Sequence, residues 1–256
     1  MEFSNQFKDK RVLITGASRG IGRAAAEAFL NADARVAING RSNSSVSKAL
    51  GELDAGDRVV AAPGNVAEVN GCAAIVEAAI DGLGGLDILI NNAGVYSEES
   101  MEDSDEAYWD SMMDTNVKGT YFCSRAALPT LRESHGNIVN LASVAGLEGY
   151  SNTTVYCASK GAIVNLTRAM AMELAPTVRV NCICPAVIDT EMTRNEFTTS
   201  EVEADAEMTA RGERYPMQRI GTTEEVASAI LYLSSSDAGF ITGIALPIEG
   251  CFTAGN

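Results

Sequence analysis

The stretch Arg11-Val12-Leu13-Ile14-Thr15-Gly16-Ala17-Ser18-Arg19-Gly20-Ile21-Gly22 decides the fold of this chain. Its first five residues are mostly apolar or β-branched and predict a buried strand, and a helical period follows from Gly20 to Asn31. Between the two lie glycines, which let a ligand approach the backbone closely. The free amides and the dipole of a helix N-terminus favour an anion. The stretch therefore predicts a strand, a phosphate-binding turn and a helix.

The same alternation of short β-branched runs and longer helical patterns continues to the end of the chain. It is typical of a parallel sheet covered by helices. We expect strands at 11–15, 35–39, 58–62, 86–91, 137–141, 178–183 and 244–247. We expect helices at 20–31, 45–52, 69–82, 104–132, 155–174 and 223–234. The pattern predicts an α/β, doubly wound, seven-stranded parallel sheet (Rossmann type), with its ligand beyond the carboxyl ends of the strands.

Composition favours a single soluble domain. The 256 residues are 46% apolar, and no linker or repeat divides them, so we expect one dinucleotide-binding and catalytic domain over 1–256. The segment 191–216, called the lid segment below, is polar and weakly periodic, and we expect it to be a mobile cover over the substrate. The start of the chain does not resemble a secretory signal, and no apolar run approaches the roughly 18 residues of a membrane span. We therefore expect a cytoplasmic protein without a membrane partner.

Charge and cysteine content exclude further classes. A net charge of −15 argues against a nucleic-acid partner, because a polyphosphate is bound by clustered lysine and arginine. The six cysteines have neither metal-ligand spacing nor the density of a disulfide-rich secreted domain, so we expect reduced thiols and no metal.

A tyrosine and a lysine one helical turn apart, Tyr156 and Lys160, point to proton transfer. A phenol titrates near about 10, so its use near neutral pH requires a neighbouring positive charge that favours the phenolate. Residues at i and i+4 lie on the same helix face, so an ammonium at Lys160 would supply that charge. Taken alone, such a pair is usually part of a solvated helix face.

Several motifs occur together in one order: Thr15-Gly16-x-x-x-Gly20-Ile21-Gly22, Asn91-Asn92-Ala93-Gly94, Asn116, Ser143, Tyr156-x-x-x-Lys160 and Pro185. In this order and spacing the chain resembles the short-chain dehydrogenase/reductase family over nearly its whole length. The resemblance implies a single seven-stranded Rossmann domain, assembled as a homotetramer or homodimer, that transfers hydride with a nicotinamide cofactor.

The resemblance also implies a catalytic set of Asn116, Ser143, Tyr156 and Lys160. Tyr156 would protonate a carbonyl oxygen or deprotonate an alcohol. Ser143 would hold the same oxygen. Lys160 would favour the Tyr156 phenolate and bind the nicotinamide ribose, and Asn116 would position a water that relays protons from Lys160.

The cofactor positions implied by the resemblance run along the whole chain. They are Gly16, Ser18, Arg19, Gly20, Ile21, Gly22, Arg41, Ser42, Asn65, Val66, Asn92, Ala93, Gly94, Tyr156, Lys160, Pro185, Ile188 and Thr190. The second strand ends Ile38-Asn39-Gly40-Arg41-Ser42 without the acidic residue that would bind the ribose hydroxyls of NAD. Arg19 and Arg41 would instead clamp a 2′-phosphate, so we expect NADP(H).

These expectations favour an NADP(H)-dependent carbonyl reductase that interconverts a small neutral ketone and a secondary alcohol. By family position we expect residues 93–99, 144–150 and the lid segment to line the substrate pocket. Leu147, Tyr150, Val187 and Met192 would make this pocket mostly apolar. Alternatives are an NAD-dependent alcohol dehydrogenase, a cofactor-binding regulator without chemistry, and a 3-oxoacyl carrier-protein reductase. The last would bind an acidic carrier through basic side chains, but the two relevant positions are Ser134 and Met172.

Overall fold

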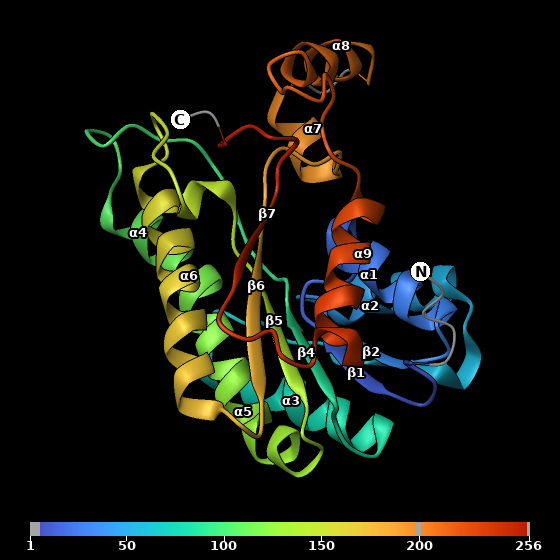
Figure 1. Ribbon diagram of the computed structural model, residues 1–256. Coiled ribbons are helices and arrows are strands. Elements are labelled where there is room, and N and C mark those ends of the chain that lie inside the picture. Colours follow the sequence, from blue (N-terminus) through green and yellow to red (C-terminus); the bar gives the residue numbers. More distant parts are fainter. Residues whose placement is uncertain (1–5, 198–200, 255–256) are drawn as a thin grey trace.

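The computed structural model describes residues 6–197 and 201–254, and its centre is a seven-stranded parallel sheet (Figure 1). The strands are β1 (Arg11–Ile14), β2 (Arg35–Ile38), β3 (Val59–Ala61), β4 (Ile88–Asn91), β5 (Asn137–Leu141), β6 (Arg179–Pro185) and β7 (Ala245–Ile248). They lie in the order β3-β2-β1-β4-β5-β6-β7. The strand order reverses direction between β1 and β4, where a doubly wound sheet binds its ligand. The predicted fold class is confirmed.

Helices cover both faces of the sheet. They are α1 (Gly20–Asn31), α2 (Asn43–Leu53), α3 (Val69–Leu83), α4 (Glu106–Met113), α5 (Gly119–Glu133), α6 (Thr154–Leu174), α7 (Glu191–Phe197), α8 (Glu201–Gly212) and α9 (Thr223–Ser234). Side chains of α1, α2 and α9 share one buried cluster, and those of α3, α5 and α6 share another. In the described part of the chain, no helix has both the length and the apolar character needed to cross a membrane.

The central strand shows how the sequence produces these two layers. In β1, Val12 and Ile14 belong to the cluster with α1 and α9, whereas Leu13 belongs to the cluster with α3 and α5. Successive side chains of a strand point to opposite faces, so an uninterrupted apolar run is what a sheet covered on both sides requires. Phe29 of α1 and Ile230 of α9 are fully buried against the first face.

The single helix predicted for residues 104–132 is interrupted. The structure has α4, then a π-helical turn at Asp114–Lys118, then α5. A π-helical turn bonds residue i to i+5 and adds one residue to a helix, which hydrophobic periodicity cannot detect over five positions. Such turns are frequent at functional sites, and this one contains Asn116.

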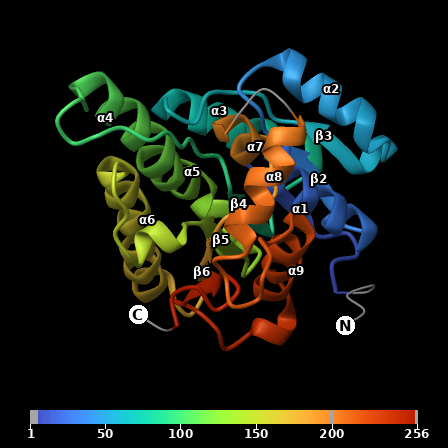
Figure 2. The same ribbon diagram turned by 90° about the horizontal axis from the view of Figure 1, so that it is seen from above.

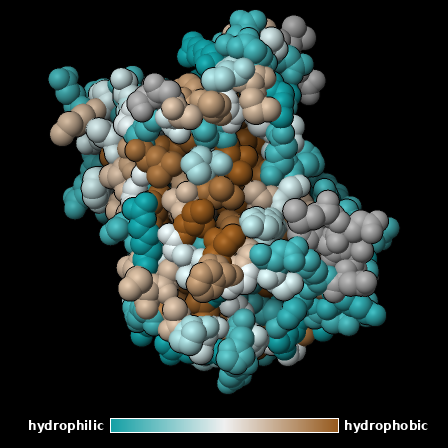
Figure 3. Space-filling view, viewed as in Figure 1, coloured by the Kyte–Doolittle hydropathy of each residue, from teal (hydrophilic) through white to brown (hydrophobic). Residues whose placement is uncertain are grey.

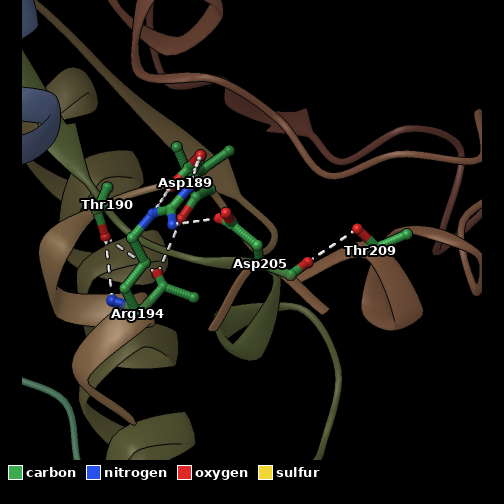
Figure 4. Close-up of polar contacts among 7 residues, drawn as sticks. Asp189, Thr190, Arg194, Asp205 and Thr209 are labelled. Atoms are coloured by element: carbon green, nitrogen blue, oxygen red, sulfur yellow. Dashed lines mark hydrogen bonds and ion pairs between the residues drawn. The ribbon is translucent and has the colours of Figure 1, made fainter. Parts of the chain in front are cut away.

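The lid segment differs from its prediction, because helices α7 and α8 form most of it; residues 198–200 lie outside the described part. Figure 4 shows Arg194 of α7 between two carboxylates. Its Nε donates to Asp189 Oδ1 at 2.6 Å, its Nη2 to Asp189 Oδ2 at 2.8 Å, and its Nη1 to Asp205 Oδ1 at 2.6 Å. The hydrogen bonds from Arg194 hold the pKa of Asp189 below its usual range. Arg194 therefore ties both helices to the loop that follows β6.

Candidate active site

A cavity of about 1190 Å³ lies at the carboxyl ends of the strands. In Figures 1 and 2, α7 and α8 stand above this end of the sheet. All the predicted site residues line the cavity except Gly22 and Asn116, which lie behind its wall. The fold therefore brings together residues that are up to 174 positions apart, from Gly16 to Thr190.

The glycine-rich turn after β1 has the close approach that a dinucleotide cradle requires. A Cβ on Gly22 would lie 2.4 Å from Asn92 Nδ2, and one on Gly16, whose φ is +64°, would lie 2.8 Å from Ala93 Cα. Asn92 Nδ2 donates to the carbonyl oxygens of Thr15 at 2.9 Å and Gly16 at 3.0 Å. No side chain caps the N-terminus of α1, so its first amides face the cavity as donors for an anion. These residues fit the pyrophosphate of a dinucleotide.

The end of β2 contributes a residue that the sequence analysis did not assign to the site. Asn39 is 2% exposed; its Oδ1 accepts from Gly16 N at 3.1 Å and its Nδ2 donates to Ala62 O at 2.9 Å. Asn39 thus holds the glycine-rich turn from the side of β2. No sequence motif announces this role, because it depends on three strands meeting.

The two arginines predicted to bind a 2′-phosphate differ in their surroundings. Arg41 is exposed at the cavity edge and forms no ion pair with any described residue. Arg19 Nη1 lies 3.4 Å from Glu191 Oε2, with both side chains more than half exposed. The predicted clamp must therefore compete with Glu191 for Arg19.

Tyr156 and Lys160 both lie on α6 and face the cavity. Lys160 Nζ is 5.6 Å from the centre of the Tyr156 ring and donates to Leu141 O at 2.9 Å. The Lys160 side chain is almost fully buried, and this burial lowers the pKa of its ammonium from 10.5 to about 8. A positive charge is thus held next to the phenol in a place where water screens it weakly.

Ser143 follows the end of β5 and lies beside Pro185, the last residue of β6. Its Oγ accepts a hydrogen bond from Ala145 N at 3.2 Å and donates to Pro185 O at 3.4 Å. Ser143 is half-buried and lines the same cavity as Tyr156.

Asn116 connects two walls of the site from behind. Its Nδ2 donates to Val95 O at 3.0 Å and to Ser159 Oγ at 3.1 Å, and its Oδ1 accepts from Val95 N at 2.8 Å. A Cβ on Gly94 would lie 3.2 Å from Asn116 Oδ1 and 3.6 Å from Lys160 Nζ. Gly94 therefore separates Asn116 from Lys160, and the amide of Asn116 fixes the loop after β4 against α6.

The substrate side of the cavity is more polar than predicted. Tyr150, Val187 and Met192 line it as expected, but Leu147 does not and is 39% exposed. The Tyr96 ring meets that of Tyr156 edge-on at 4.7 Å between centroids. The regions predicted to line this side also contribute Tyr96, Glu98, Arg211, Arg214 and Tyr215, whereas Phe252 lies outside those regions and was missed.

The family model described as "short chain dehydrogenase" matches residues 10–201. The chain belongs to the short-chain dehydrogenase/reductase family. This membership makes it an oxidoreductase that acts on CH–OH groups and uses a nicotinamide cofactor. The resemblance inferred from the glycine-rich turn and the Tyr-x-x-x-Lys motif is confirmed.

Two relatives and one solved structure resemble this short-chain dehydrogenase/reductase over nearly its full length. It is 38% identical to 2-(S)-hydroxypropyl-CoM dehydrogenase 3 of Xanthobacter autotrophicus, over 98% of this chain and 99% of the relative. It is 36% identical to meso-2,3-butanediol dehydrogenase of Serratia marcescens, over 97% and 96%. The ligand-free aldohexose dehydrogenase of Thermoplasma acidophilum superposes with a TM-score of 0.87 at 33% identity, over 96% and 95%.

Proposed function

We propose that the protein interconverts a ketone and a secondary alcohol with NADP(H), and that Tyr156 is the general acid and base. The observation that carries this proposal is the pairing of Tyr156 with the buried ammonium of Lys160, in the same cavity as a glycine-lined dinucleotide cradle. Two relatives named for a hydroxypropyl compound and for 2,3-butanediol, both secondary alcohols, support this substrate class.

Each proposed catalytic residue has one task. When bound, the nicotinamide supplies or accepts the hydride. Tyr156 Oη gives its proton to the carbonyl oxygen in reduction and removes the hydroxyl proton in oxidation. Ser143 Oγ donates a hydrogen bond to the same oxygen and stabilises its developing negative charge. Lys160 favours the phenolate of Tyr156 by its charge, and Asn116 keeps the helix that carries both residues in place.

NADP(H) is the proposed cofactor because the end of β2 carries Arg41 and no acid. A guanidinium with no competing ion pair among the described residues suits a phosphate dianion. The second candidate is an NAD-dependent alcohol dehydrogenase. The contact of Arg19 with Glu191 favours it, because this contact engages one of the two guanidiniums proposed to bind the 2′-phosphate and leaves only Arg41.

Titration of the purified protein with NADPH and with NADH, followed by cofactor fluorescence, distinguishes the two candidates. We expect NADPH to bind at least ten-fold tighter, which corresponds to about 1.4 kcal/mol. Arg41→Ala should remove most of this preference, whereas Arg132→Ala, an exposed arginine on α5 outside the cavity, should not change it. Equal or tighter binding of NADH would overturn the choice of NADP(H) and favour an NAD-dependent alcohol dehydrogenase.

Tyr156→Phe tests the acid-base role separately. The variant keeps the ring and loses only the hydroxyl, so we expect cofactor binding to persist while kcat falls by at least about 10²-fold. Undiminished turnover in this variant would contradict the proposed mechanism.

We further propose a single domain that assembles as a homo-oligomer in the cytoplasm. Figure 3 shows apolar surface gathered over β7, between α6 and α9. Phe240 and Met172 are almost fully exposed. Exposed apolar surface of this kind is typical of a contact between copies of a chain. Light scattering coupled to size-exclusion chromatography measures the mass of the assembly in solution and therefore tests this proposal.

A further inference from the structure

The last described residues of the chain contribute a wall of the cavity that belongs neither to the glycine-rich turn nor to the catalytic set. After β7 the chain reverses at residues 249–253, called the C-terminal turn below, where Phe252 N donates to Glu249 O at 3.1 Å. The two central residues, Gly250 and Cys251, have φ values of +60° and +69°, as in a type I′ turn. Phe252 follows these two residues and lines the cavity.

The C-terminal turn is held in place by its own hydrogen bonds and by packing. Glu249 Oε2 accepts a hydrogen bond from Thr253 N at 2.6 Å. A Cβ on Gly250 would lie 3.5 Å from Tyr215 Cδ1 and 3.6 Å from Met217 Cβ, so the backbone of the turn lies against the residues that follow α8. In Figure 1 the chain leaves β7 at the end of the sheet where α7 stands. The end of the chain therefore reaches the lid side of the site.

Tyr215 connects the C-terminal turn to the loop after β6. Its ring is 4.8 Å from the Phe252 ring between centroids. Tyr215 is 6% exposed, and its hydroxyl accepts a hydrogen bond from Val187 N at 3.3 Å. Val187 follows Pro185 by two residues, and the carbonyl oxygen of Pro185 accepts from Ser143 Oγ at 3.4 Å. Because these contacts are continuous, the two rings border the proposed catalytic residues.

A third aromatic ring stands on this side of the cavity. Tyr150, from the loop before α6, lines the cavity together with Tyr215 and Phe252. Burial raises the pKa of Tyr150 to about 12, and the proximity of Glu148 and Tyr215 adds to the increase. Burial also raises the pKa of Tyr215. Both phenols are therefore uncharged near neutral pH, and three separate segments bring uncharged rings to the substrate side.

Charged side chains also lie near these rings. Arg211 and Arg214 line the cavity, and the charges of both arginines and of Glu249 act on the pKa of Tyr215. Phe252 differs from all of these neighbours, because its side chain has no polar atom and gains free energy only by removing apolar surface from water. It is half-buried, so part of its ring surface remains for a ligand to cover. A phenylalanine in this place favours an apolar part of a ligand.

We propose that Phe252 and Tyr215 form an apolar subsite for the larger substituent of the substrate, which is thus an unsymmetrical ketone or secondary alcohol with one extended aliphatic or aromatic group. The inference rests on the proposed function and deepens it. With the carbonyl oxygen held at Tyr156 and Ser143, the larger substituent lies against the two rings. Phe252 therefore sets the preference for substituent size and takes no part in proton or hydride transfer.

A series of methyl ketones tests this subsite. We would compare kcat/KM for butan-2-one, pentan-2-one and hexan-2-one, using the tighter-binding reduced cofactor. Burial of one methylene group corresponds to a factor of about four, so we expect kcat/KM to rise by about ten-fold or more from butan-2-one to hexan-2-one, chiefly through KM. Phe252→Ala should remove most of this rise and change the value for butan-2-one by less than about three-fold.

Two variants control for a change in structure. Phe252→Leu keeps an apolar side chain in the subsite and should retain most of the rise. Met101→Ala removes an exposed apolar side chain outside the cavity and should leave the rise unchanged. A Phe252→Ala variant that loses kcat/KM equally with all three ketones would overturn the subsite, because such a loss would indicate a general structural role.

Titration with carboxamides gives a readout that does not depend on turnover, because a nicotinamide cofactor does not reduce an amide carbonyl. We expect the cofactor-bound wild type to bind hexanamide at least about ten-fold tighter than acetamide in calorimetry. Phe252→Ala should lose most of this preference. The milder variant Phe252→Val provides the same comparison if Phe252→Ala does not fold.

The outcomes separate this inference from the proposed function. Equal use of the three ketones by the wild type, or a rise that survives in Phe252→Ala, would overturn the apolar subsite while leaving the oxidoreductase intact. Failure to reduce any ketone would count against the proposed function. The amide titration would then still decide the subsite, because a hexanamide preference that is lost in Phe252→Ala supports it, and equal or absent binding of the two amides by the wild type refutes it.

Discussion

Replacing Lys160 by methionine should make the protein more stable near neutral pH while reducing its activity. The folded protein lowers the pKa of this buried ammonium from 10.5 to about 8. At pH 6.5 the lysine is protonated in both the folded and the unfolded chain. The free energy of unfolding is therefore lowered by the full cost of moving this charge out of water. The difference between the two pKa values corresponds to about 3 kcal/mol, because one pKa unit is about 1.4 kcal/mol.

Part of this cost is offset in the wild type. Lys160 Nζ donates to Leu141 O at 2.9 Å, and losing this bond costs about 1 kcal/mol. We therefore expect Lys160→Met to raise the free energy of unfolding by about 2 kcal/mol at pH 6.5, which corresponds to a Tm increase of roughly 4–8 °C.

The dependence on pH identifies the cause. Between pH 8 and 10.5 the unfolded wild type binds more protons than the folded protein does, so wild-type stability rises with pH in this window. The advantage of the variant should accordingly shrink over the same window. Thermal unfolding at pH 6.5, 8 and 9.5 measures both effects, with Lys8→Met, an exposed lysine, as the matched control.

Two results would refute the reasoning. One is a Lys160→Met variant that is less stable than the wild type at pH 6.5. The other is a stability difference that stays constant from pH 6.5 to 9.5, because a mere change in packing would not depend on the protonation of Lys160.

Three further substitutions test the glycine-rich turn, helix α2 and the Arg11–Asp87 ion pair. Gly22→Ala should abolish cofactor binding and lower Tm, because the new Cβ would lie 2.4 Å from Asn92 Nδ2. Gly51→Ala should instead stabilise helix α2 by about 0.5–1 kcal/mol, because no heavy atom lies within 4 Å of the new Cβ. Calorimetry measures both changes in stability. Arg11→Gln should cost about 1–3 kcal/mol in urea unfolding at pH 7, because Arg11 Nε lies 2.8 Å from the partly buried Asp87 carboxylate. Burial raises the pKa of Asp87, but the hydrogen bonds from Arg11 outweigh burial and leave this pKa below its usual value. The stability that the Arg11–Asp87 pair contributes should therefore be present above about pH 4 and disappear as the pH falls further. An Arg11→Gln variant as stable as the wild type at pH 7 would contradict the pairing.

The sequence predicted most of the fold because local patterns and tertiary structure agree. The helix at 20–31 and the strand at 137–141 have the predicted bounds, since apolar periodicity and glycine mark them clearly. The break at Asp114–Lys118 was missed, because one inserted residue does not disturb a period of 3.6 enough to be seen. The helices of the lid segment were missed because their faces are mostly polar, and part of their anchorage comes from Arg194 rather than from an apolar stripe.

The residues of the candidate site likewise fall into those that the sequence identified and those that it did not. Residues in contiguous motifs, such as Gly16 and Tyr156, were found because their spacing alone carries chemistry. Asn39 was not, because it acquires its place only when distant strands meet. The substrate side was predicted to be apolar from Leu147, Tyr150, Val187 and Met192, whereas Glu98 and Arg211 also line the cavity and Leu147 does not.

The extra residue in the π-helical turn limits how far this protein could be redesigned. In a regular α-helix each residue advances by about 100°, so deleting one residue from Asp114–Lys118 would turn α4 by about that angle relative to α5. An engineer who straightened the helix would gain regular hydrogen bonds. The same change would move the Asn116 amide away from Val95 and Ser159, its partners on two walls of the cavity. Thermostabilisation of this chain should therefore begin elsewhere, at positions such as Gly51, and leave this irregular turn as it is.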